Sequence, residues 1–165
     1  MKQRVLLLIF ALISARGGCD EHMVVSVDKV LVKKTQRLLY LIKDGKIHRQ
    51  YPISLGSDPV DPKQRMGDKR TPEGHYLIDY RSSKSQFYRA LHINYPNATD
   101  RQRAKATGVN PGGQIFIHGS PNNLAVKASW RSPVDWTFGC IALSNEAIDE
   151  IWQLVKDGTP IEIVH

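Results

Sequence analysis

Short apolar runs, separated by turn residues, fill most of the chain between Val30 and Ile117. Nine Pro and twelve Gly interrupt the sequence and mark these turns. Runs this short are typical of strands, because a strand crosses a sheet with a few residues whereas a buried helix needs about ten or more. The 165-residue length suits one domain with a sizeable core. The sequence therefore predicts a single β-rich domain.

The predicted strands differ in length, and the second and third are joined by a tight hairpin turn at Asp44-Gly45. In the third strand, period-two spacing places four apolar residues on one face: Ile47, Tyr51, Ile53 and Leu55. The following segment, Gly56–Gly74, is rich in turn residues and is expected to be a long surface loop. The segments expected to form strands are 30–32, 38–42, 47–55, 75–80, 91–95, 115–117 and 161–164.

One substantial helix is predicted near the C-terminus. Its apolar stripe has the spacing i, i+3, i+4, i+7 and consists of Ile148, Ile151, Trp152 and Val155. Ser144 or Asn145 can cap its start, and Asp157-Gly158 is expected to end it. A shorter helix is predicted over Thr99–Thr107. The expected fold class is mainly β: a sandwich or barrel with mostly antiparallel pairing, this C-terminal helix and the short helix.

The N-terminus has the pattern of an export signal. A basic start containing Lys2 and Arg4 precedes the apolar run Val5–Ala15, which is too short to span a bilayer comfortably. We therefore expect residues 1–18 to be a signal peptide and residues 19–165 to form one domain. Two small residues before Cys19 are similar to a bacterial lipoprotein cleavage site, which would attach the protein to a membrane through lipidated Cys19. Cleavage elsewhere in this region would instead leave Cys19 as an ordinary thiol.

The charge of the chain excludes an obvious nucleic-acid-binding role. The full sequence has 23 basic and 16 acidic residues, a formal net charge of +7. Cleavage before Cys19 removes three basic residues and no acidic one, which leaves 20 basic and 16 acidic residues and a net charge of +4. We see neither a run of Lys and Arg nor a nucleic-acid-binding motif. A solvated, mildly basic surface is the expected consequence.

Cys140 and His118 are the candidate chemical groups. Only two cysteines occur, which excludes a disulfide-stapled scaffold and a four-cysteine zinc site. A cysteine nucleophile needs a base to form the thiolate, and His118 follows a predicted strand where it can serve as that base. Gly139 allows close backbone approach, so its N–H and that of Cys140 can form an oxyanion hole. From the residues alone, an inert buried thiol and a structural histidine are the favoured interpretations.

Two segments carry a resemblance to a known family. Ile117-His118-Gly119, followed by the segment 137–145 (Thr-Phe-Gly-Cys-Ile-Ala-Leu-Ser-Asn), resembles the signature of the L,D-transpeptidase catalytic domain, also called the YkuD family. That signature is a His-Gly pair, a variable loop, and then Ser/Thr-x-Gly-Cys-Ile/Val. Upstream, Gly67–Gly74 is similar to the family's Gly-Asp-x-x-Thr-Pro-x-Gly loop. The resemblance covers roughly Val27–Val164, nearly all of the expected mature chain.

The resemblance implies a specific chemistry. Cys140 would attack a peptide carbonyl in a peptidoglycan peptide stem and form a thioester, with His118 as general acid and base. A backbone carbonyl at Gly119 or Ser120 would orient the imidazole. An amine acceptor would give a cross-link or attach a wall protein, whereas water would give hydrolysis. Neither a metal nor an organic cofactor is implied, and the expected location is the periplasm or cell envelope.

This sequence departs from the family pattern at two positions. Phe138 stands where many members have His, and Ala142 stands where many have Arg, a side chain that can bind a carboxylate with two hydrogen bonds. These departures leave open a hydrolase that uses the same thioester, such as an L,D-carboxypeptidase or a wall-protein-releasing enzyme, and a non-catalytic wall-binding module. The residues expected to contact substrate are Thr137, Ser120, Phe138, Arg131 and Trp136.

Overall fold

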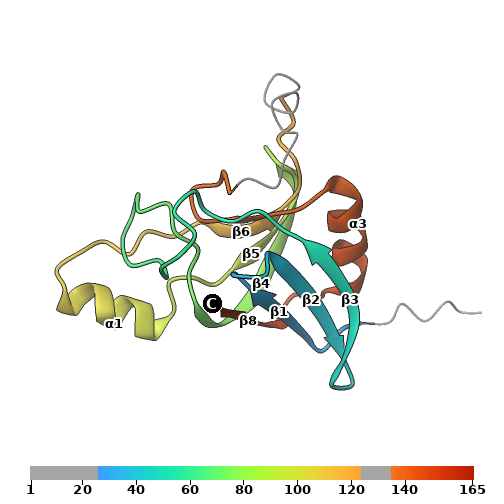
Figure 1. Cartoon of the computed structure of the whole chain (residues 1–165), viewed down its shortest axis with the longest axis horizontal. Helices are drawn as coiled ribbons and strands as arrows, with labels where there is room; N and C mark the ends of the chain where they lie inside the picture. The colour runs from blue at the N-terminus through green and yellow to red at the C-terminus, as the bar shows by residue number, and fades with distance from the viewer. Residues whose placement is uncertain (1–25, 124–134) are drawn as a thin grey trace, which may run out of the picture.

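The computed structural model describes residues 26–123 and 135–165. The expected signal peptide, Cys19 and Arg131 therefore lie outside the described residues. Within them the chain forms one eight-stranded sheet and two helices (Figure 1). The elements are β1 (Lys29–Lys33), β2 (Leu38–Lys43), β3 (Lys46–Pro52), β4 (Gly74–Ser85), β5 (Tyr88–Ile93), α1 (Ala98–Ala106), β6 (Ile115–His118), β7 (Ile141–Ala142), α3 (Asn145–Leu154) and β8 (Pro160–Val164).

The sheet closes on itself. Its strand order is β3-β2-β1-β8-β4-β5-β6-β7, and the pairing is antiparallel except between β1 and β8 and between β6 and β7. The two ends of this order meet through Ser54, just after β3, and Ala142 in β7, which exchange two backbone hydrogen bonds of 2.9 Å. A second bridge joins Gly56 to Thr137. Closure pairs the edges that an open sheet would expose, and it gives a barrel.

The long strand β4 links the two halves of this barrel. Its first residues, 74–77, pair with β8, and from Ile78 onward it pairs with β5 as far as Ser85. A two-residue turn, Gln86-Phe87, joins β4 to β5. The sequence predicts a strand that ends at Tyr80, because the polar residues beyond it show no apolar alternation. The structure extends the hairpin through this polar segment, past the edge of the core.

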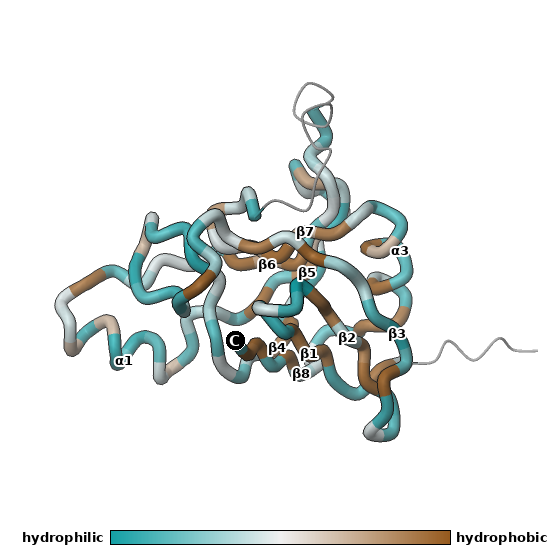
Figure 2. The backbone as a smooth tube through the Cα atoms, in the orientation of Figure 1, coloured by the Kyte–Doolittle hydropathy of each residue, from teal (hydrophilic) through white to brown (hydrophobic). Residues whose placement is uncertain are grey.

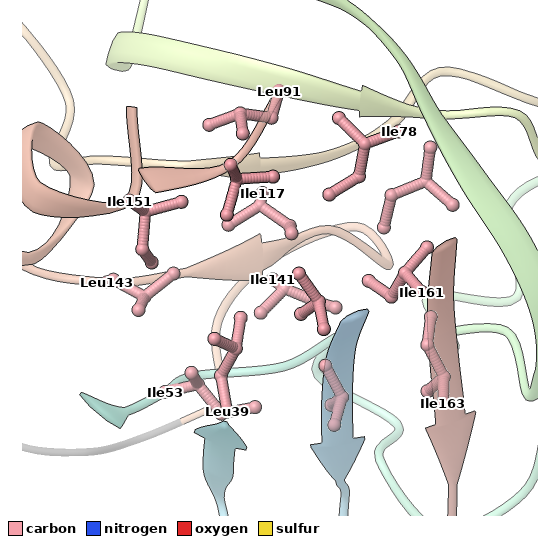
Figure 3. Close-up of a cluster of buried hydrophobic side chains, with 14 of the residues drawn as sticks. Leu39, Ile53, Ile78, Leu91, Ile117, Ile141, Leu143, Ile151, Ile161 and Ile163 are labelled. Atoms are coloured by element: carbon pink, nitrogen blue, oxygen red, sulfur yellow. The ribbon is translucent and has the colours of Figure 1, made fainter. Parts of the chain in front are cut away.

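The core lies inside the curled sheet. Figure 3 shows branched aliphatic side chains from β2, β4, β5, β6, β7 and β8 pointing toward one another, and Figure 2 shows hydrophobic stretches along several of these strands. Helix α3 covers one side, where Ile148, Ile151 and Val155, the residue that follows the helix, are completely buried. The Ser144 side chain caps α3 by accepting from the Ala147 N–H at 3.2 Å. The mainly β fold class, with one substantial helix near the C-terminus, is confirmed.

One predicted core residue is misplaced. Ile47 is 62% exposed, whereas Tyr51, Ile53 and Leu55 are buried as expected. The ladder between β2 and β3 shifts register beside Ile42, because Leu41 pairs with Arg49 while Ile42 pairs with Ile47. One extra residue in β3 reverses the side-chain alternation on its far side. Ile47 therefore leaves the face predicted from period two.

The predicted surface loop over residues 56–74 is anchored in the barrel. Thr71 is fully buried, and its hydroxyl accepts from the Gly56 N–H at 3.1 Å. Lys34, 1% exposed, reaches into the loop, where its ammonium donates to Glu73 Oε1 at 2.7 Å and to the Asp61 carbonyl at 3.1 Å. Burial of a charged amine costs free energy unless it is paired, and these partners supply that pairing. The loop is thereby held against the barrel, where Gly56 and Gly139 also meet.

Helix α1 is polar and projects away from the barrel in Figure 1. A capping box starts it: Asn97 Oδ1 accepts from the Asp100 N–H, and Asp100 accepts from the Asn97 N–H, both at 3.1 Å. Neither of the two helices in residues 26–123 and 135–165 is long and apolar enough to cross a membrane.

Candidate active site

The parallel pairing of β6 with β7 brings His118 and Cys140 to one face of the sheet. Ile117 pairs with Ile141, and both of these side chains are fully buried in the core. Side chains alternate along a strand, so His118 and Cys140 both face away from that core. They open into one cleft of about 440 Å³. Its remaining lining residues are Tyr80, Ser82, Ser85, Gln86, Phe87, Ala90, Gln114 and Phe116.

The imidazole of His118 is held in one tautomer. Its Nδ1 lies 2.8 Å from the Gly119 carbonyl oxygen. A carbonyl oxygen only accepts, so Nδ1 carries the proton and Nε2 keeps a free lone pair. The side chain is buried, and this burial lowers the pKa of His118 to about 4, although the Gly119 hydrogen bond acts in the opposite direction. At neutral pH the ring is therefore an uncharged base.

Two aromatic rings enclose this imidazole. The Phe87 ring centroid lies 4.5 Å from that of His118, at an interplanar angle of 37°. The Trp136 ring lies 5.7 Å away in an edge-to-face arrangement, with an interplanar angle of 78°. Phe87 comes from the β4–β5 turn, and Trp136 comes from the segment before Cys140. These rings supply the burial that keeps the imidazole uncharged.

The thiol of Cys140 is also uncharged at rest. Burial raises its pKa above the usual value, while a backbone hydrogen bond at Phe116 and the positive charge of Lys63 partly oppose that effect. The thiol donates to the Gln114 carbonyl oxygen at 3.5 Å. Gln114 has a φ of 58°, which non-glycine residues adopt infrequently and often at functional sites. The pair is therefore a neutral thiol and a neutral imidazole, and a thiol in this state becomes a strong nucleophile only when a base removes its proton.

This electrostatic state predicts an unusual pH dependence. The rate at which an acylating carbapenem-type probe modifies Cys140 is expected to stay high as pH falls through 6.5, and to fall by half only near pH 4. The base form of His118 is lost only when pH falls through its own lowered pKa. Stopped-flow or mass-spectrometric acylation rates between pH 4 and pH 8 measure this profile. A half-maximal rate near pH 6.5 would show that the imidazole is solvated.

Thr137 supports the turn that presents Cys140. It is 3% exposed, and its hydroxyl donates to the Cys140 carbonyl at 2.7 Å while accepting from the Gly139 N–H at 3.1 Å. Gly139 has a φ of +120°, and a Cβ there would lie 2.5 Å from the Arg70 carbonyl oxygen. Only glycine suits that position. The Gly139 N–H, expected in an oxyanion hole, donates to the Thr137 hydroxyl in this structure.

The other expected substrate contacts are placed differently. Phe138 is 78% exposed and lies under the Lys69 ammonium, 5.8 Å from its ring centroid, outside the cleft lining. Ser120 is buried, and its N–H donates to Asn145 Oδ1 at 2.8 Å. Ala142, also buried, occupies the closure of the barrel beside Ser54. Trp136 contacts the His118 imidazole, and Arg131 lies outside the described residues.

Sequence reasoning missed the cleft wall formed by the β4–β5 hairpin. This wall contributes Tyr80, Ser82 and Phe87, and its turn follows a polar segment with no recognisable motif. The positive φ of Gln114 was equally hidden, because glycine is the residue usually expected there. In residues 26–123 and 135–165, no three His, Cys, Asp or Glu side chains are grouped in a way that could hold a metal ion.

Comparisons with known proteins agree with this site. The family model for the L,D-transpeptidase catalytic domain matches residues 24–163. The Escherichia coli K12 protein named "Putative L,D-transpeptidase YafK" is 34% identical over 132 residues, which cover 76% of this chain and 46% of that protein.

Two solved structures share the fold. The helical cell shape determining protein Pgp2 from Campylobacter jejuni is 30% identical, with a TM-score of 0.64, over 83% of this chain and 47% of Pgp2. An L,D-transpeptidase from Xylanimonas cellulosilytica shares the fold at a TM-score of 0.53 and 18% identity, over 85% of this chain and 61% of the other. The chain spans about half the length of YafK and of Pgp2. The matched family model, together with the paired His118 and Cys140, shows that this chain belongs to the L,D-transpeptidase catalytic domain (YkuD) family.

Proposed function

We propose that the protein is an exported cysteine L,D-transpeptidase that remodels peptidoglycan through a thioester at Cys140. The observation that carries this proposal is the shared cleft of His118 and Cys140, in which a tautomer-fixed neutral imidazole accompanies a protonated thiol. Family membership supports peptidoglycan peptide stems as the substrate class. The name of Pgp2, a cell shape determining protein, supports a role in shaping the wall.

The proposed reaction has two halves that use the same imidazole. His118 Nε2 takes the thiol proton as Cys140 Sγ attacks the stem carbonyl and forms a C–S bond. The scissile C–N bond then breaks, and the departing amine takes that proton from Nε2. In the second half, Nε2 removes a proton from the acceptor amine, which attacks the thioester. A new C–N bond forms, and the C–S bond breaks as the sulfur regains its proton.

The backbone supports both halves. Each attack produces a tetrahedral oxyanion next to Cys140 Sγ, and the Cys140 N–H is the nearest main-chain donor in the sequence. The Thr137 hydroxyl donates to the Cys140 carbonyl and accepts from the Gly139 N–H, so it fixes the peptide units on both sides of the one that carries the Cys140 N–H. The Gly119 carbonyl keeps the proton on His118 Nδ1 throughout, so Nε2 is the only ring nitrogen that exchanges protons.

Location follows from the substrate class and the N-terminal sequence. A peptidoglycan substrate lies outside the inner membrane, and the basic start followed by Val5–Ala15 has the pattern of an export signal. We therefore place the domain in the periplasm or cell envelope. Lipidation at Cys19 would hold it at a membrane, close to a wall-attached protein that could serve as acceptor or substrate.

Digestion of defined muropeptides tests the proposed transfer. Purified protein, incubated with a tetrapeptide muropeptide, is expected to release the terminal D-residue and to form a product that contains an added amine acceptor. Mass spectrometry with and without the acceptor separates transfer from hydrolysis. If all products derive from attack by water, the protein is instead a hydrolase that uses the same thioester. No turnover and no covalent adduct would leave a wall-binding module.

A further inference from the structure

The turn that places Phe87 on the His118 ring is conformationally demanding. Tyr88, directly after this turn, has a φ of 64°, an unfavourable backbone conformation for an aromatic residue. The two-residue turn also lies at the end of a hairpin that extends past the core. Such a turn needs external support to keep a single conformation.

Asn122 provides that support at three points. Its side-chain Nδ2 donates to the Ser85 carbonyl at 2.9 Å, and its backbone N–H donates to the Gln86 carbonyl at 3.0 Å. Its side-chain Oδ1 accepts from the Tyr88 N–H at 2.9 Å. The three residues that Asn122 contacts by hydrogen bonds flank Phe87 on both sides in the sequence. Asn122 itself follows His118 by four residues, so the segment that carries the base also holds the ring above it.

Neighbouring contacts complete the attachment. The Gly119 N–H lies between two carbonyl acceptors of the hairpin, at 3.1 Å from Phe87 and 3.2 Å from Arg89. A Cβ on Gly119 would lie 2.6 Å from Asn145 Oδ1 and 3.1 Å from Tyr88 Cβ, so this close approach requires glycine. The Tyr88 hydroxyl donates to Asp149 on α3 at 2.9 Å.

We infer that Asn122 is a positioning residue for the general base: it fixes the β4–β5 turn so that the Phe87 ring stays packed against the His118 imidazole. Asn122 acts on His118 through Phe87 and needs no contact with the reacting atoms. The inference rests on the proposed function only for its catalytic consequence. The placement of the ring and the protonation of His118 are properties of the free protein and can be measured without turnover.

The protonation of His118 reports on this placement. Burial lowers the pKa of His118, and Phe87 is one of the two rings that contact it. Cys140 and Tyr80 are the titratable groups that line its cleft with it. The charged groups at the base of the turn, Arg89 and Asp149, pair with each other at 2.9 Å. Loosening the turn admits water to the imidazole, and hydration favours its charged form.

Asn122→Ala, which removes two of the three hydrogen bonds, is the primary test. The NMR titration midpoint of the His118 ring, identified by its absence in His118→Asn, is expected to rise by at least about one pKa unit from its value near 4. Asn94→Ala is the matched control, because the Asn94 side chain accepts from the Leu77 N–H at 2.9 Å, far along the same hairpin from its turn. This control is expected to leave the midpoint unchanged.

Phe87→Leu separates positioning from general destabilisation. It removes the ring that packs against His118 without touching Asn122, and it is expected to raise the same midpoint. The double variant Asn122→Ala/Phe87→Leu is expected to raise it no further than Phe87→Leu alone. An unchanged His118 midpoint in folded Asn122→Ala would overturn the inference, as would fully additive shifts in the double variant. If Asn122→Ala does not fold, a Phe87→Leu midpoint equal to that of the unmodified protein would overturn it.

Discussion

Replacing Cys140 with Ala is expected to abolish covalent modification by a carbapenem-type probe and to lower muropeptide turnover by at least about a thousandfold. The sulfur is the only nucleophile in the proposed mechanism, and the neutral imidazole beside it cannot replace it as a stable acyl carrier. Ser82 and Ser85 also line the cleft, but they lie on the β4–β5 hairpin, whereas the β6–β7 ladder brings Cys140 to the same face as His118. Intact-protein mass spectrometry measures the adduct directly.

Cys140→Ser is the matched control for this prediction. It keeps the size of the side chain and the Thr137-supported turn, but a hydroxyl is a much weaker acid than a thiol and gives little nucleophile with a neutral imidazole. We expect it to bind muropeptides like the unmodified protein while forming no adduct within the assay time. An adduct of the probe on Cys140→Ala protein, mapped by peptide sequencing to another residue, would reject Cys140 as the nucleophile.

Much of the barrel could be predicted from hydrophobic spacing. Helix periodicity and capping are local properties, so the sequence could predict the apolar stripe of Ile148, Ile151 and Val155 and the Ser144 cap of α3. The exposure of Ile47 could not be predicted, because it depends on a register shift between β2 and β3. Likewise, the closure of the barrel between Ser54 and Ala142 joins residues far apart in sequence, and neither segment carries a local mark of the contact.

The sequence predicts some residues of the candidate site and leaves others unidentified. His118 and Cys140 follow from the family resemblance, whereas their residue types alone leave a structural reading open. The resemblance implies an orienting carbonyl at Gly119 or Ser120, and His118 Nδ1 lies 2.8 Å from that of Gly119. The roles of Asn122 and Phe87 were not predictable, because they arise from a hairpin that folds back over the His-Gly segment. Long-range hydrogen bonds to main-chain atoms carry no sequence pattern, since any residue supplies the same backbone groups.

The two motif segments also meet in the folded structure, at a contact that the sequence does not mark. Gly56 lies between the Gly67–Gly74 loop and the Cys140 turn, and it has no neighbouring motif of its own. A Cβ at Gly56 would lie 2.0 Å from the Lys69 carbonyl oxygen and 3.1 Å from Gly139 Cα. Both neighbours are backbone atoms, so neither can move aside by changing a side-chain rotamer. Gly56 thus sets the distance at which the upstream loop and the nucleophile turn pack together.

Gly56→Ala is therefore expected to destabilise the domain by about 3 kcal/mol or more, because overpacking against backbone shifts whole segments. At this chain length that loss corresponds to a fall in Tm of about 10 °C. Activity should fall further than stability explains, since the displaced atoms include Gly139, which precedes the nucleophile. Calorimetry and the probe-acylation rate, measured well below the lowered Tm, separate the two effects.

Gly113→Ala is the matched substitution for this comparison. The nearest atoms to a Cβ at Gly113 lie 3.8 and 3.9 Å away, which is ordinary van der Waals contact. We expect a change in unfolding free energy within about 1 kcal/mol, because no neighbour has to move. Equal melting temperatures for Gly56→Ala and Gly113→Ala would mean that the Gly56 contact can relax without cost. A normal acylation rate in a destabilised Gly56→Ala protein would instead show that the Cys140 turn keeps its geometry independently of the upstream loop.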